Sequence, residues 1–165
     1  MTNYIFVDID GPLLPAKLQL LHQNRKTGKE NPPVFDQFAV LCFNLWAKYS
    51  DAQIVFSTNW ALNYSVDGLK YIMDVNGLDF KYSSDCVTPK RFTSNRHIEI
   101  MDWLRHNSDE GDTFIVVDDD QDCRHIEEML NDGQAGNEIK ARGKWIDVDF
   151  TNGLSLQNFI DGVDA

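Results

Sequence analysis

The chain has few basic residues and no long apolar run. Its 165 residues include 15 lysines and arginines against 26 aspartates and glutamates, which gives a net charge of −11. This balance argues against broad electrostatic capture of nucleic acid or of an anionic membrane surface. No apolar run approaches the length of a membrane span, and no basic leader followed by an apolar segment is present. Neither a membrane anchor nor a signal peptide is therefore expected.

Cysteine is also scarce. The three cysteines, Cys42, Cys86 and Cys123, are an odd number and show no Cys-x-x-Cys spacing. A disulfide framework or a zinc knuckle is therefore not expected, and reduced thiols in a cytoplasmic protein are the simple interpretation. The length fits one domain with a substantial core, so we expect a single domain over residues 1–165.

The rest of the chain is organised around residues 4–13. An apolar run over residues 4–7 leads into Asp8, Asp10 follows, and Gly11-Pro12 ends the run. This pattern predicts a buried strand with both aspartates at its carboxyl end, the edge where open parallel sheets bind ligands. Two carboxylates on one face of a strand repel each other unless a cation or a proton lies between them. The same spacing also fits two solvated turn aspartates.

Apolar periodicity predicts the remaining elements. Strands are expected at 52–56, 113–117 and 145–148, and helices at 34–49, 61–77, 121–131 and 154–160. A further helix, capped by Thr93 or Ser94, is expected to contain residues 98–104. Residues 12–33 are expected to be irregular, and residues 78–89 are ambiguous, with a short strand at 80–82 as one interpretation. Helix-length crossovers between buried strands indicate an α/β fold. We expect one Rossmann-like domain with a mainly parallel sheet of about five strands and helices on both faces.

Two further strand ends carry polar side chains. Ser57 and Thr58 follow the second strand, and Asp118, Asp119 and Asp120 follow the third. In a parallel sheet these ends meet the first aspartate pair at one edge. Oxygen ligands without His or Cys favour Mg²⁺ over zinc, and Mg²⁺ would neutralise the carboxylates and clamp a phosphate. The two hydroxyls could donate hydrogen bonds to the phosphate oxygens.

A phosphate also needs a protein cation to balance its charge. Lys90, Arg91 and Arg96 lie in the segment that leads to the third strand, and residues 17–29 form the most basic part of the chain. A loop of that length is usually functional or disordered. The basic loop could cover the site and meet an anionic substrate, or it could be a solvated loop.

The order and spacing of these motifs resemble the haloacid dehalogenase-like (HAD) superfamily of phosphohydrolases. In that family an apolar strand is followed by Asp-x-Asp-Gly-x-Leu, a second strand ends in Ser or Thr, and a later strand ends in an acidic pair. The corresponding segments here are residues 6–13 (FVDIDGPL), 54–58 (IVFST) and 115–119 (IVVDD). The resemblance covers nearly the whole chain.

A narrower resemblance is to the compact HAD domains grouped with RNA-repair proteins. Their second motif often continues Ser-Ser-x-Trp-Arg, followed later by a basic residue, Glu-Ile and Trp-Leu. This chain has STNW at 57–60, RHIEIMDWL at 96–104 and GLS at 153–155, with Ala61 in place of the arginine.

The family resemblance implies a role for each carboxylate. Asp8 would attack phosphorus and form an aspartyl-phosphate. Asp10 would be the general acid for the leaving oxygen and then the base for the attacking water. The Asp8 carboxylate, the Asp10 backbone carbonyl and Asp119 would hold Mg²⁺, with Asp118 binding directly or through water.

The same resemblance assigns the phosphate-binding groups. Ser57 would bind the transferring phosphoryl group, with Thr58 beside it. Arg96, which heads a predicted helix, would supply the cation of the family's third motif, and Lys90 is the second candidate. Because phosphoryl transfer depends mostly on positioning and charge neutralisation, these residue types suit the reaction.

The sequence indicates the size of any cap domain and so the kinds of substrate that could reach the site. HAD enzymes often select substrates with an inserted cap, and residues 14–33 and 61–89 are too short for a large one. The implied open site suits a phosphorylated substrate that is a small ester, a phosphopeptide or a nucleic-acid end. Trp60 could stack on a base or pack in the core.

Magnesium-dependent hydrolysis of phosphate monoesters is therefore the function we expect. One alternative is a Rossmann-like metal-dependent nuclease, which also gathers aspartates at strand ends. Another is a non-catalytic acidic binding protein with a HAD fold. A receiver domain fits poorly, because its phosphorylated aspartate would lie on a middle strand where this chain has Ser57.

Overall fold

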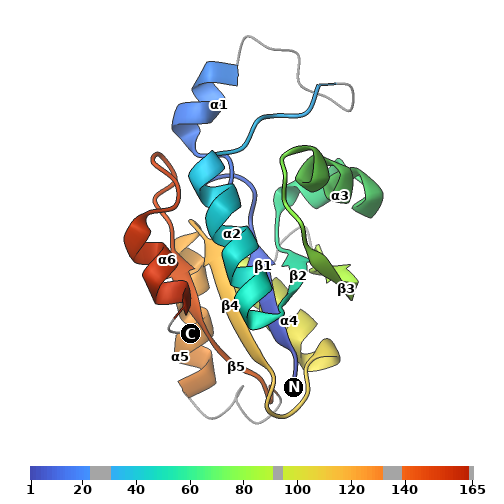
Figure 1. Cartoon of the computed structure of the whole chain (residues 1–165). Coiled ribbons are helices and arrows are strands. Elements are labelled where there is room, and N and C mark those ends of the chain that lie inside the picture. Colours follow the sequence, from blue (N-terminus) through green and yellow to red (C-terminus); the bar gives the residue numbers. More distant parts are fainter. Residues whose placement is uncertain (23–30, 91–94, 132–138, 164–165) are drawn as a thin grey trace.

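The computed structural model describes residues 1–22, 31–90, 95–131 and 139–163, which form one α/β unit around a five-stranded sheet. All neighbouring strands are parallel, in the order β3-β2-β1-β4-β5 (Figure 1). The strands are β1 (Asn3–Val7), β2 (Gln53–Phe56), β3 (Lys81–Val87), β4 (Thr113–Asp118) and β5 (Arg142–Asp147). The predicted Rossmann-like fold is confirmed, with the strand that carries the first motif at the centre of the sheet.

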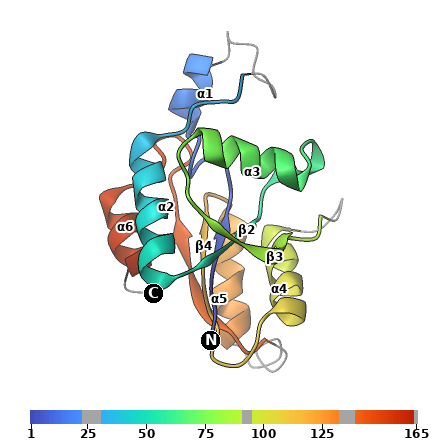
Figure 2. The ribbon, with the colours of Figure 1, turned by 45° about the vertical axis from the view of Figure 1, so that its right-hand side comes forward.

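Helices cover both faces of this sheet, as expected. Figure 2 shows α2 and α6 on one side of the strands and α4 and α5 on the other. The helices are α1 (Ala16–His22), α2 (Gln37–Ser50), α3 (Val66–Val75), α4 (Arg96–Asn107), α5 (Arg124–Asn131) and α6 (Leu156–Val163), with 3-10 turns η1 (Asn59–Leu62) and η2 (Gln121–Cys123). None of the helices in the described part of the chain is long and apolar enough to cross a membrane.

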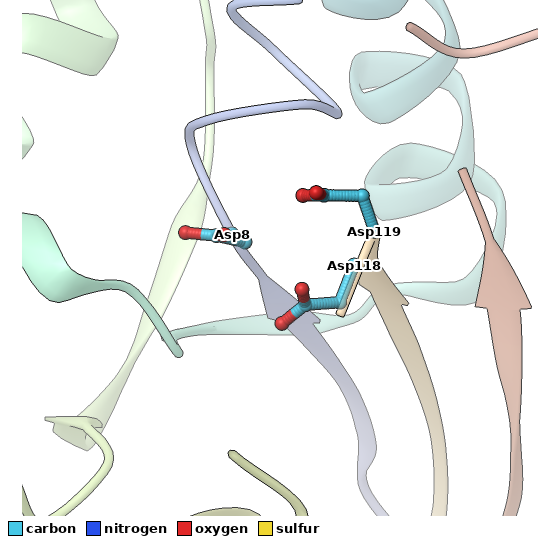
Figure 3. A group of neighbouring side chains, drawn as sticks. All are labelled: Asp8, Asp118 and Asp119. Carbon is cyan, nitrogen blue, oxygen red and sulfur yellow. The ribbon is translucent and has the colours of Figure 1, made fainter. Parts of the chain in front are cut away.

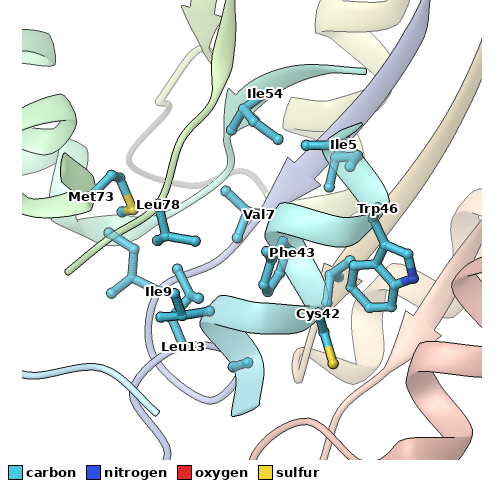
Figure 4. Close-up of a cluster of buried hydrophobic side chains, with 14 of the residues drawn as sticks. Ile5, Val7, Ile9, Leu13, Cys42, Phe43, Trp46, Ile54, Met73 and Leu78 are labelled. Carbon is cyan, nitrogen blue, oxygen red and sulfur yellow. The ribbon is translucent and has the colours of Figure 1, made fainter. Parts of the chain in front are cut away.

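Alternating side chains of the central strand build two cores. Ile5 and Val7 pack on the side of α2 and α3, in a cluster that Figure 4 shows. Tyr4 and Phe6 point to the opposite side and pack against α4, where the Phe6 and Trp103 rings meet edge to face at 5.2 Å. Because both faces of β1 are buried, its register against β2 and β4 is strongly specified.

The expectation that residues 12–33 are irregular was wrong for residues 16–22. Residues 16–22 form the seven-residue helix α1 at the carboxyl edge of the sheet, and the backbone amide of Ala16 donates to the carbonyl of Phe150. Leu20 and Leu21 are exposed on α1. So short a helix, with little apolar burial, leaves a weak periodic signal. Residues 23–30, which hold most of the predicted basic loop, lie outside the described residues.

Three other boundaries differ from the sequence-based expectation. The helix expected at 61–77 is divided into the 3-10 turn η1 and α3. The ambiguous stretch contributes the whole edge strand β3, which pairs with β2 through a register shift. The last strand begins at Arg142. Edge strands carry polar residues, so their sequences lack the apolar run that identifies a buried strand.

Candidate functional site

The carboxylates of Asp8, Asp118 and Asp119 lie together at the carboxyl ends of β1 and β4 (Figure 3). One ligand oxygen from each lies within 4.8 Å of the others. The register explains this meeting, because Val7 is paired with Val117 and the amide of Asp8 donates to the Val117 carbonyl at 3.1 Å. The next residue on each strand is therefore an aspartate, and the two lie side by side.

Burial makes this cluster difficult to ionise. It raises the pKa of Asp8, although the guanidinium of Arg96 and a hydrogen bond from Thr58 oppose the shift. Burial and the neighbouring Asp8 raise the pKa of Asp118 well above its usual range. The same two causes raise the pKa of Asp119 to about 6. Three adjacent carboxyl groups with raised pKa values form a site whose full ionisation needs an added cation.

The donor set fits a hard divalent cation. All three cluster members offer carboxylate oxygens, and the buried Oδ2 of Asp118 makes an ion pair with Nε of Arg96 at 3.2 Å but no hydrogen bond. One guanidinium cannot balance three neighbouring carboxylates, so a further cation or a proton is needed among them. Cations that prefer oxygen ligands, such as Mg²⁺, match this set better than cations that prefer sulfur or imidazole.

Among the described residues, Arg96 is a cation that faces the cluster; Arg91, another predicted candidate, lies outside them. Arg96 begins α4 and is buried, with its Nη2 3.7 Å from Oδ2 of Asp8 and its Nε 3.2 Å from Oδ2 of Asp118. Burial lowers the pKa of Arg96, but the facing Asp8, Asp118 and Glu99 together outweigh burial and raise it. Arg96 therefore remains charged between the two buried carboxylates.

Lys90, the second predicted cation, lies close by with a different partner. Its Nζ is 2.6 Å from Oε2 of Glu99, which also lies 3.7 Å from Nη1 of Arg96. Burial lowers the pKa of Lys90, and the nearby Arg96 lowers it further. The sequence analysis noted Glu99 as part of the Glu-Ile motif but gave it no role. The available signal was its position three residues after Arg96 on one helix, where the two side chains share a face.

The two hydroxyl residues occupy the end of β2. The amide of Ser57 donates to the Val7 carbonyl at 2.9 Å, and its Oγ is buried without a hydrogen-bond partner. The Thr58 side chain bonds Asp8, and its Oγ1 accepts from the amide of Trp60 at 3.3 Å. The structure therefore brings both residues beside Asp8, with Ser57 offering an unused donor.

Asp10 stands apart from the carboxylate cluster. Its Oδ2 accepts a hydrogen bond from Nε1 of Trp60 at 2.9 Å, and its Oδ1 accepts one from Nε2 of Gln19 at 3.1 Å. Sequence reasoning considered Trp60 only for stacking or core packing and did not consider Gln19. Each contact joins two separate elements, so no helix or strand periodicity in the sequence indicates it.

Gly11 allows the turn after β1 to pass close to the cluster. Its φ is +81°, a backbone conformation that residues with a side chain rarely adopt. A Cβ there would lie 2.7 Å from Cγ of Asp119. A glycine is therefore required both by the backbone conformation and by the position of the Asp119 carboxylate.

Comparisons with known proteins agree with this geometry. A family model for the HAD domain in Swiss Army Knife RNA repair proteins matches residues 4–159. Among solved structures, the HAD domain of effector protein Lem4 from Legionella pneumophila is similar in fold, with a TM-score of 0.55, 11% identity, and coverage of 98% of this chain and 93% of that chain. No curated protein matches. The family match spans all five strands and the carboxylate cluster, and the chain therefore belongs to the family of HAD domains in Swiss Army Knife RNA repair proteins.

Proposed function

We propose that the protein is a magnesium-dependent phosphatase that hydrolyses phosphate monoesters through an aspartyl-phosphate on Asp8. The observation that carries this proposal is the meeting of three carboxylates within 4.8 Å, with the buried Arg96 beside Asp8 and Asp118. A phosphoryl group can lie only where negative charge is balanced, and this arrangement combines a cation with a set of cation ligands.

In the first step, a carboxylate oxygen of Asp8 attacks the phosphorus of the ester. The bond between phosphorus and the ester oxygen breaks, and that oxygen leaves with a proton given by Asp10. In the second step, water attacks the phosphorus of the aspartyl-phosphate and gives a proton back to Asp10. The bond between phosphorus and Asp8 breaks, which releases inorganic phosphate and restores both carboxyl groups.

The remaining residues neutralise and orient the phosphoryl group. Arg96 lies where it can pair with phosphate oxygens, and the unpartnered Oγ of Ser57 can donate to one of them. Asp8, Asp118, Asp119 and the Asp10 carbonyl would hold Mg²⁺, which would supply positive charge that offsets the repulsion between the nucleophile and the phosphate. Lys90 adds a second positive charge next to Arg96 and is tied to Glu99.

Several substrate classes fit this site. The described part of the chain between β1 and α2 contains the short helix α1 and no larger cap. A small phosphate ester, a phosphopeptide and a phosphorylated nucleic-acid end all suit such a site. The net charge of −11 makes strong, unaided capture of a long nucleic acid the least favourable of these.

Phosphate release from a panel of substrates tests the proposal. The panel holds an aryl phosphate, mononucleotides, phosphopeptides, and oligonucleotides with 3′ or 5′ phosphates, each with Mg²⁺ and with EDTA. We expect turnover that depends on Mg²⁺ and is lost in Asp8→Asn, together with a phosphorylated protein intermediate that hydroxylamine cleaves. Strand cleavage without phosphate release would support a nuclease instead. Folded protein that binds Mg²⁺ but turns over no member would support a binding protein.

A further inference from the structure

Asp10 is held from two sides by N–H donors of different segments. The Trp60 indole in η1 donates to one carboxylate oxygen at 2.9 Å, and the Gln19 amide in α1 donates to the other at 3.1 Å. Gln19 is itself fixed, because the same nitrogen donates to the carbonyl of Leu14 at 2.9 Å. The carboxyl group that the family resemblance makes the proton donor therefore has its orientation set by Trp60 and Gln19.

Trp60 is rigidly supported in this role. Its backbone amide donates to the Thr58 side chain at the start of η1, and its ring stacks on Tyr64 at 5.5 Å. The aromatic ring also packs against the core on the α2 side of the sheet. An indole N–H can only donate, so it fixes Oδ2 of Asp10 as an acceptor.

The arrangement keeps Asp10 out of the neighbouring carboxylate cluster. Asp8, Asp118 and Asp119 form the group that could hold a cation, and the side chain of Asp10 is not part of it. Each carboxylate oxygen has a second lone pair, so the two bonds leave positions on Asp10 for exchanging a proton.

We propose that Trp60 and Gln19 are positioning residues that aim the Asp10 carboxyl group at the leaving oxygen of the substrate. This inference rests on the proposed phosphatase function and adds to it the two side chains on which proton transfer depends. The strength of general acid catalysis depends on the leaving group, because a good leaving group departs without a proton and a poor one does not.

The test compares two substrates in Trp60→Phe, which keeps the aromatic ring and removes the donor. The substrates are 4-nitrophenyl phosphate, whose leaving group is a stable anion, and glycerol 2-phosphate, whose leaving group is an alkoxide. The quantity measured is kcat/KM, because it covers the steps up to departure of the leaving group and not the later attack by water. We expect a fall of about 10- to 100-fold with glycerol 2-phosphate and a fall of less than about 3-fold with 4-nitrophenyl phosphate.

Matched variants separate positioning from simple loss of stability. Trp46→Phe removes an indole hydrogen bond to the Phe159 carbonyl, 3.1 Å long and away from the site, and should leave the ratio of the two kcat/KM values unchanged. Asp10→Asn should lower kcat/KM for glycerol 2-phosphate, relative to that for 4-nitrophenyl phosphate, by a larger factor than Trp60→Phe does. Gln19→Met serves as the second test if Trp60→Phe folds poorly. Equal losses on both substrates in Trp60→Phe and Gln19→Met would overturn the proposal.

A second measurement examines the contact without turnover. In ¹⁵N-labelled protein the Trp60 indole resonance, identified by its loss in Trp60→Phe, should move in Asp10→Asn. The indoles of Trp46 and Trp103, which donate to backbone carbonyls, should stay in place. If the Trp60 resonance has the same position in wild type and Asp10→Asn, the hydrogen bond from Trp60 to Asp10 is overturned, and the positioning role with it. Wild-type protein that hydrolyses no phosphate ester while this resonance moves would instead overturn the proposed phosphatase, and the positioning role that rests on it.

Discussion

Gly11 and Asp119 are so close that the site has no space for a side chain on Gly11. A Cβ on Gly11 would lie 2.7 Å from Cγ of Asp119 and 3.1 Å from its Cβ, and the backbone φ there is +81°. Gly77 has nearly the same φ, +82°, but a Cβ there would meet nothing within 4 Å. The two glycines therefore share a left-handed backbone conformation, which would strain an alanine, and differ in what its methyl group would displace.

Gly11→Ala and Gly77→Ala should lower stability to a similar degree, by about 1–2 kcal/mol, because each puts alanine in a left-handed conformation. Only Gly11→Ala should also displace the Asp119 carboxylate. We expect thermal unfolding to show that Gly77→Ala keeps the full rise in Tm on adding Mg²⁺, and that Gly11→Ala loses most of it. A full Mg²⁺ response in Gly11→Ala would contradict the assigned cation site.

Mg²⁺ should stabilise the folded chain through the carboxylate cluster. At a concentration one hundred times the Kd, a ligand that binds only the folded state adds about 2.7 kcal/mol. Asp119→Asn should remove most of this gain. Asp147→Asn is the matched control, because Asp147 lies exposed at the end of β5, at the same sheet edge but outside the cluster. Calorimetric or fluorescence melting curves with Mg²⁺ and with EDTA measure the effect, and equal losses in both variants would argue against this site.

Without a bound cation, the raised pKa of Asp119 should make the folded state less stable as pH rises. Burial and the adjacent Asp8 raise this pKa from 3.8 to about 6, so between these values the folded state binds more protons than the unfolded state. Stability then falls across this window and stays lower above it. Urea unfolding in EDTA should show the free-energy difference between Asp119→Asn and wild type growing in favour of the variant from pH 4 to pH 6.5. Parallel pH curves for the two proteins would contradict the raised pKa.

Arg96 should matter more for turnover than Lys90. Arg96 faces Asp8 and Asp118, whereas Lys90 is held 2.6 Å from Glu99. We expect Arg96→Gln to lower kcat/KM by about 100- to 1,000-fold, the range seen when a group that stabilises transition-state charge is removed, and Lys90→Gln to lower it by less than about 10-fold. Circular dichroism should confirm that both variants are folded. The reverse order of effects would make Lys90 the principal phosphate-binding cation.

The sequence predicts the carboxylate site because strand geometry alone brings its members together. Asp8, Asp118 and Asp119 follow apolar runs, and parallel strands place the residues after such runs at a common edge. Ser57 reaches the same edge for the same reason. No side-chain contact had to be known for this part of the prediction.

The parts that sequence reasoning missed depend on contacts between separate elements. The bond from Trp60 to Asp10 depends on how η1 turns over the end of β1, and the bond from Gln19 depends on α1, a helix too short to be recognised. The link from Lys90 to Glu99 likewise joins a loop to a helix. Apolar periodicity indicates which residues of one helix or strand are buried and which face they share. It does not indicate which polar groups of different elements form hydrogen bonds.

The carboxylates and hydroxyls of the site follow β1, β2 and β4, the three inner strands of the order β3-β2-β1-β4-β5. Inner strands open only in the larger unfolding events, whereas edges fray in smaller ones. We therefore expect the reacting groups to belong to the part of the molecule whose amide hydrogens exchange most slowly. Insertions, or docking of another chain, can remodel the sheet's outer edges during evolution while the spacing of the aspartates stays unchanged.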